Sequence, residues 1–131
     1  MKHTKQDCPC GRPLPFQECC HRFIVGIEFP KTAEDLMRSR YSAYATGAIP
    51  YIHQTTHPRD RDKVSLADIS QWIDAVNSWD KLVVLNTHKG QATDTQGTVE
   101  FVAHFHQKHH PQMLHEISHF TKWDARWMVL I

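Results

Sequence analysis

The feature of this sequence that most constrains its fold is the position of its cysteines. All four of them, Cys8, Cys10, Cys19 and Cys20, lie close to the N-terminus. Thiols this close together cannot crosslink a whole domain, but two short pairs separated by residues 11–18 match the spacing of a tetrahedral metal site. Adjacent cysteines point to opposite sides of an extended chain, so the chain has to bend for both to bind one ion, and His21 is an alternative fourth ligand. Four thiolates leave no coordination position for water, so the segment predicts a structural zinc ion, the alternative being free or oxidised thiols.

The rest of the composition is that of a small globular protein. The 131 residues are 40% hydrophobic and 22% charged, which excludes general disorder. The formal net charge of +1 provides no large basic excess, so we expect no binding to nucleic acid. No apolar run approaches the roughly 18 residues of a membrane helix, and the N-terminus has no apolar signal core. We therefore expect a cytoplasmic protein with no membrane association.

Residues 23–80 show the three-to-four spacing of apolar residues that is typical of amphipathic helices. Capping and breaker residues divide this region into predicted helices at 32–47, 50–57 and 65–76. The alternating charges of Arg59–Lys63 predict a solvated loop between the last two helices.

From about residue 81 the apolar period changes to two. This period predicts strands at 81–87, 98–106, 113–121 and 126–131. In the second of them, alternate residues from Val99 to Phe105 form an apolar face, and those from Glu100 to His106 form the other face. Consecutive strands with short connections predict an antiparallel meander, and helices followed by strands indicate an α+β fold.

Two segments of the sequence also resemble known families. The run CPCGRPLPFQECC resembles the SEC-C motif, a zinc-binding knuckle, with the four cysteines in the ligand positions. That match favours Cys20 over His21. The remainder resembles the YchJ family of uncharacterised bacterial proteins. The segments that carry this resemblance are LMRSRYSAY (36–44), Thr55 with His57-Pro58, GTVEFVAHF (97–105), HEISHF (115–120) and Trp127.

The resemblance implies an α+β fold in two parts. Residues 1–22 would form the SEC-C zinc knuckle, and residues 23–131 a nuclear transport factor 2-like (cystatin-like) cone of helices packed on a curved antiparallel sheet. Many relatives continue into a second knuckle, whereas this sequence ends at Ile131, so we expect no function that requires two knuckles. The resemblance assigns no biochemical role.

A charged and aromatic group on the first long helix predicts a partly polar cavity. Arg40 shares a helix face with Tyr41 and Tyr44, and a buried arginine needs a compensating partner. We expect a carboxylate, Glu100 or Glu116, to form a structural ion pair with it, and an anion-binding pocket is the alternative. The cavity would lie between this helix and the predicted third strand.

Histidines add a second candidate group. If the second and third predicted strands pair, His104 or His106 could face His119 or Glu116. Such a group could act as a general acid or base, bind a second metal, or be solvated and structural. The pocket candidates are Arg40, Tyr41, Tyr44, His57, His104, His115 and Glu116.

These features favour a non-catalytic, zinc-stabilised module, so no catalytic residue is assigned. The knuckle would contact a protein partner, and the cone would serve as a scaffold or bind a small ligand. The alternative is a small-molecule enzyme that uses a His/Glu/Tyr pocket in the cone. A cavity group with a strongly shifted pKa would favour the enzyme, whereas an exposed apolar patch beside the knuckle would favour the interaction module.

Overall fold

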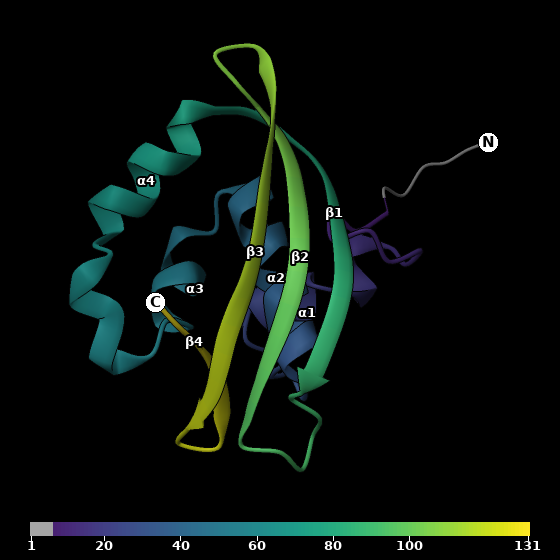
Figure 1. Cartoon of the computed structure of the whole chain (residues 1–131), viewed down its shortest axis with the longest axis vertical. Helices are drawn as coiled ribbons and strands as arrows, with labels where there is room; N and C mark the ends of the chain where they lie inside the picture. The colour runs from purple at the N-terminus through teal and green to yellow at the C-terminus, as the bar shows by residue number, and fades with distance from the viewer. Residues whose placement is uncertain (1–6) are drawn as a thin grey trace.

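The computed structural model describes residues 7–131, so the first six residues of the predicted knuckle lie outside it. Figure 1 shows an α+β fold in which helices precede a curved four-stranded sheet, as the sequence predicts. The elements, with short 3-10 helices labelled η, are η1 (Phe16–Glu18), α1 (His21–Ile24), α2 (Ala33–Thr46), α3 (Ile49–Gln54), η2 (Pro58–Lys63), α4 (Leu66–Ala75), β1 (Val76–Lys89), β2 (Gln96–Gln107), β3 (His110–Trp123) and β4 (Arg126–Leu130).

Helix α2 has the predicted limits because local residues determine both of its ends. The Thr32 side chain accepts a hydrogen bond from the backbone N–H of Asp35 at 3.0 Å, which satisfies one of the first-turn donors. At the other end, Gly47 has a φ of 78°, the left-handed conformation that commonly terminates a helix. The helix therefore begins and ends where the sequence predicts.

The sheet is an antiparallel meander in the order β1-β2-β3-β4. Its apolar face is the one predicted for β2, with Val99, Phe101, Ala103 and Phe105 buried. Helix α2 packs against this face of β1 and β2, while α4 stands to one side (Figure 1). Strand β4 pairs with β3 only over residues 119–123. Beyond that overlap, the space between β3 and the helices is available for a cavity.

The segment Arg59–Lys63 is not the solvated loop that its charges predict. It forms most of η2, and the Asp60 side chain is fully buried. The Asp60 carboxylate accepts hydrogen bonds from Arg59 at 3.1 Å and from the backbone N–H of Ile131 at 2.9 Å, and Lys63 lies 3.0 Å away. The prediction was wrong because the carboxylate stabilises the end of a strand 71 residues away in the sequence. Among residues 7–131, no helix has both the length and the apolar character needed to cross a membrane.

Candidate metal centre and cavity

The four cysteine sulfurs converge on one point. Their Sγ atoms all lie within 4.8 Å of one another, at 3.7 Å for Cys10–Cys19 and 4.0 Å for Cys19–Cys20. Tetrahedral coordination with zinc–sulfur bonds of about 2.3 Å places the sulfurs about 3.8 Å apart. All four side chains are buried, so the donor set fits a closed, thiolate-bound metal ion.

The backbone bends where the spacing of the cysteines requires it. Gly11, with φ of 94°, donates its N–H to the carbonyl of Cys8 at 3.1 Å and turns the chain after the first pair. A Cβ at Gly11 would also lie 3.4 Å from the carbonyl oxygen of Leu82, and its φ disfavours other residues. In the second pair, Cys19 is the C-cap residue of η1 and Cys20 is the N-cap residue of α1. That change of direction lets two adjacent side chains reach the same point. His21 is outside the cluster, and its ring packs edge-on against Phe16.

Helix α2 contacts the cysteine segment through the face that carries Arg38 and Ser42, which we call its outward face because it points away from the cavity. Arg38 donates to the carbonyl of Cys10 at 2.7 Å, and the hydroxyl of Ser42 lies 3.4 Å from the sulfur of Cys8. On the same face, Arg12 forms an ion pair with Asp35 at 2.8 Å. Arg38 and Ser42 are not among the site residues predicted from the sequence, because their one-turn spacing, away from the apolar stripe, is the only sequence feature that connects them.

Burial makes the cluster unfavourable for several thiolates at once. It is the main cause that raises the pKa of Cys19 to about 12, and the neighbouring Cys10 and Cys8 raise it further. A thiol with such a pKa is protonated at neutral pH unless a cation is present. Metal binding at this centre therefore displaces protons.

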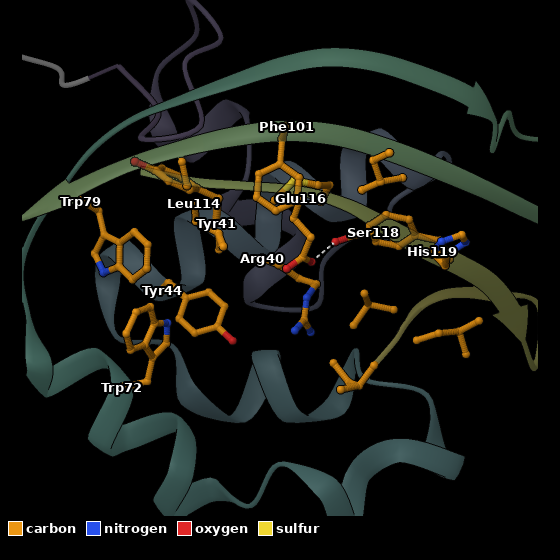
Figure 2. A pocket seen from close by; sticks show the side chains of 17 residues that line it. Arg40, Tyr41, Tyr44, Trp72, Trp79, Phe101, Leu114, Glu116, Ser118 and His119 are labelled. Carbon is orange, nitrogen blue, oxygen red and sulfur yellow. Dashed lines mark hydrogen bonds between the residues drawn. The ribbon is translucent and has the colours of Figure 1, made fainter. Parts of the chain in front are cut away.

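On the inner side of α2 lies a cavity of about 460 Å³ (Figure 2). It occupies the position that the sequence analysis predicts, between α2 and β3. Arg40, Tyr41 and Tyr44 line it from the helix, and Glu116 lines it from β3. One end is aromatic, where Trp79 lies 5.6 Å from Tyr44 between ring centroids. Trp72 completes that end, with its ring centroid 6.1 Å from that of Trp79.

Arg40 does not form the ion pair with a carboxylate that the sequence analysis expects. Its Nη1 atom donates to the carbonyl of Ile52 and to the hydroxyl of Thr55, both at 2.7 Å. Among residues 7–131, no carboxylate oxygen lies within 4.0 Å of its guanidinium. Carbonyl oxygens at the end of a helix compete with a carboxylate for the same donor, so Arg40 connects α2 to the end of α3.

The predicted histidine group does not assemble. In the register of β2 and β3, His104 faces Met113, and His115 instead pairs with Glu100 at 2.7 Å. Both histidines lie on the face of the sheet opposite the buried apolar residues, away from Arg40 and Glu116. The expectation fails because it requires a register that the two strands do not adopt. His57 lines a second cavity of about 560 Å³, together with basic residues including Arg59 and Lys89.

Comparisons with known proteins place these features in a family. Residues 32–130 match the family model described as the middle, nuclear transport factor 2-like domain of YchJ. The chain belongs to the YchJ family. The chain is 40% identical to a UPF0225 protein of Geobacter sulfurreducens over 120 residues, which cover 92% of this chain and 74% of the relative. It is 38% identical to a UPF0225 protein of Bordetella pertussis over 125 residues, covering 92% and 86% of the two chains.

Two solved structures share the fold over almost the whole YchJ-family chain. A SEC-C motif containing protein from Rhodopseudomonas palustris is 32% identical, with a TM-score of 0.87 and 96% of both chains covered. A SEC-C motif containing protein from Psychrobacter arcticus is 31% identical, with a TM-score of 0.83, covering 96% of this chain and 81% of that one. The similarity includes the cysteine segment, so the chain is a SEC-C protein whose cysteine cluster is compatible with metal binding.

Proposed function

We propose that this chain is a non-catalytic binding module, in which a structural zinc ion stabilises the N-terminal knuckle and the cone binds a small ligand. The observation that carries the proposal is the position of α2. Its outward face contacts the cysteine segment through Arg38 and Ser42, and its inward face contributes Arg40 and Tyr44 to the cavity. The metal centre thus supports the helix that forms one wall of the cavity.

The donor set favours zinc in a structural role. Four buried thiolates at tetrahedral spacing match zinc and leave no open position for a reacting water. We expect about one zinc ion per chain in protein purified without a histidine tag, measured by elemental analysis. The variant Cys10→Ser should lose the metal. The control variant Thr46→Ala, at the C-terminal end of α2, should retain it. A folded, metal-free wild-type chain with four reactive thiols would contradict the assignment.

Ligand binding is supported by the size and lining of the cavity. About 460 Å³ lies within the range of small-molecule sites, and the walls combine aromatic side chains with a few charged groups. A thermal-shift screen of the zinc-loaded chain should find small molecules that raise the melting temperature. The variant Trp72→Ala should lose this response with an unchanged zinc content. Chemical conversion of the bound compound during incubation would instead support the enzyme alternative.

A protein partner at the knuckle is a second candidate, favoured by a separate observation. Val25, Ile27 and Phe29 follow α1 directly, and their side chains are half or more exposed. These three exposed apolar residues follow the cysteine segment closely in the sequence. Substituting Ile27→Asp should abolish capture of a protein partner, whereas Leu85→Asp, an equally drastic change on the sheet, should not. Equal loss with both variants would indicate nonspecific apolar adhesion.

A further inference from the structure

Three properties of the cavity together restrict the ligand it can accept, and the first is the incomplete pairing of Arg40. This side chain is only 8% exposed, and its protein hydrogen bonds all come from Nη1. A guanidinium has five N–H donors, so Nε and Nη2 retain donors beyond these two bonds, and the hydroxyl of Tyr44 on the cavity wall is the side-chain group close enough to influence them. The only fully enclosed side-chain polar atom without a partner in residues 7–131 is the hydroxyl of Tyr41. The free donors of Arg40 are therefore reachable from the cavity.

The second property is an acidic group that faces the same space. Figure 2 shows the carboxylate of Glu116 and the side chain of Arg40 in the same part of the cavity, which both residues line. Their charged atoms do not come within ion-pair distance in residues 7–131, and Glu116 accepts a hydrogen bond only from the hydroxyl of Ser118, at 2.5 Å. A ligand that carries only a negative charge would be attracted by Arg40 and repelled by Glu116. A ligand that carries only a positive charge would be repelled by Arg40 and attracted by Glu116.

The third property is the aromatic end of the cavity. Tyr44, Trp72 and Trp79 form a continuous group of rings there, with edge-to-face contacts such as the one between Trp72 and Trp79. Such a surface accepts a large apolar group and offers it little hydrogen bonding. The cavity therefore presents a positive donor, a negative acceptor and an apolar aromatic end.

We propose that the cavity binds a free α-amino acid with a large apolar or aromatic side chain. This inference rests on the ligand-binding part of the proposed function and names its chemical class. The ligand carboxylate accepts hydrogen bonds from the free nitrogens of Arg40, and its ammonium group donates to Glu116. Both charges of an α-amino acid are attached to the same carbon, which suits two opposite charges facing the same space. The side chain packs among Tyr44, Trp72 and Trp79.

Calorimetry with the zinc-loaded chain tests each charge separately. L-phenylalanine should bind at least tenfold more tightly than 3-phenylpropionate, which lacks the ammonium group, and than 2-phenylethylamine, which lacks the carboxylate. Binding of 3-phenylpropionate as tight as that of phenylalanine would overturn the inference, because the site would then require only an anion. Failure of phenylalanine, tryptophan and leucine to bind at millimolar concentration would overturn it as well.

Variants on the two faces of the sheet provide matched controls. Glu116→Gln should weaken phenylalanine binding at least tenfold and leave 3-phenylpropionate binding equal or tighter, because the repulsion is removed. Glu100→Gln lies on the opposite face, where Glu100 pairs with His115, and should change neither affinity. An unchanged phenylalanine affinity in Glu116→Gln would overturn the inference. If other compounds still raise the melting temperature while amino acids do not bind, the proposed function stands and this inference fails.

Discussion

The hydroxyl of Tyr41 is buried and has no hydrogen-bond partner among residues 7–131. Burial raises the pKa of Tyr41 to about 12, so the phenol is neutral at physiological pH. The hydroxyl of Tyr51, whose pKa burial also raises to about 12, instead shares a hydrogen bond of 2.6 Å with Ser39. An unsatisfied buried donor costs free energy, whereas a satisfied one contributes to stability.

Because only one of the two hydroxyls has a hydrogen-bond partner, we expect the same substitution to affect stability differently at the two tyrosines. Tyr41→Phe should leave the melting temperature unchanged or raise it, because it removes a polar atom that has no partner. Tyr51→Phe should lower the free energy of unfolding by about 1 kcal/mol through loss of the bond to Ser39. Thermal unfolding of both variants with zinc present measures the difference. A loss of stability in Tyr41→Phe equal to that in Tyr51→Phe would mean that the hydroxyl has a partner, such as an internal water molecule.

We expect the buried carboxyl of Asp60 to make the stability of the protein depend on pH. The side chain of Arg59, the backbone N–H of Ile131 and the side chain of Lys63 hold the pKa of its carboxyl well below the usual range. A carboxyl with a depressed folded-state pKa stabilises the protein above its unfolded-state pKa of about 3.9, and this contribution is lost as the pH falls below that value. Asp60→Asn should therefore be less stable than the wild type at pH 7 and should show a flatter stability profile between about pH 5 and pH 2.

The matched control for Asp60 is its exposed neighbour Asp62. Asp62→Asn should reproduce the wild-type pH profile in chemical denaturation experiments at several pH values. If Asp60→Asn also kept the wild-type profile, the acid sensitivity would have to come from other carboxyl groups. The sequence could not predict this role, because the charge alternation of the segment is local, whereas Ile131 is far along the chain.

At the scale of elements, the sequence predicts best what neighbouring residues determine. The limits of α2 follow from Thr32 and Gly47, and the buried face of β2 follows from its alternation. The pairing register of the strands cannot be predicted from neighbouring residues in this way. Strand β1 has irregularities at three places in its pairing with β2, and His104 and His115 lie on the outer face rather than in the cavity. Register depends on contacts between strands, which a single strand's pattern does not contain.

We expect a substitution on helix α2 to lower the metal affinity of the cysteine cluster. Because the hydroxyl of Ser42 lies 3.4 Å from the sulfur of Cys8, Ser42→Ala removes a contact that orients a ligand. Substitutions of this kind typically reduce metal affinity by about 10- to 100-fold, so we expect a zinc affinity about tenfold lower in competition with a chromophoric chelator. The control is Thr46→Ala, one turn further, whose hydroxyl donates to the carbonyl of Ser42 at 2.8 Å. An unchanged affinity in Ser42→Ala would show that the sulfur needs no support from α2.

At the scale of the whole molecule, the cysteine segment and the body share one core. The four cysteines and Phe23 belong to the same buried cluster as Leu36 of α2 and Leu82 of β1. A contact within the body also connects its last strand to the start of its helical region. The indole N–H of Trp127 donates to the carbonyl of Lys31 at 3.0 Å, and the two residues are 96 positions apart in the sequence. The cysteine segment therefore covers one side of the assembly of sheet and helices.

This arrangement predicts the outcome of removing the metal. The cysteine segment buries few apolar side chains apart from the thiols, so a metal ion bound there would supply most of its folding free energy. The body contributes its own apolar side chains to that shared core, between α2 and the sheet. With a strong chelator, we expect most of the helical circular dichroism to remain, while the melting temperature falls because α2 loses its outer cover. Cys8→Ser should reproduce both effects without chelator. Loss of most of the helical signal together with zinc would show that the knuckle and the body fold as one unit.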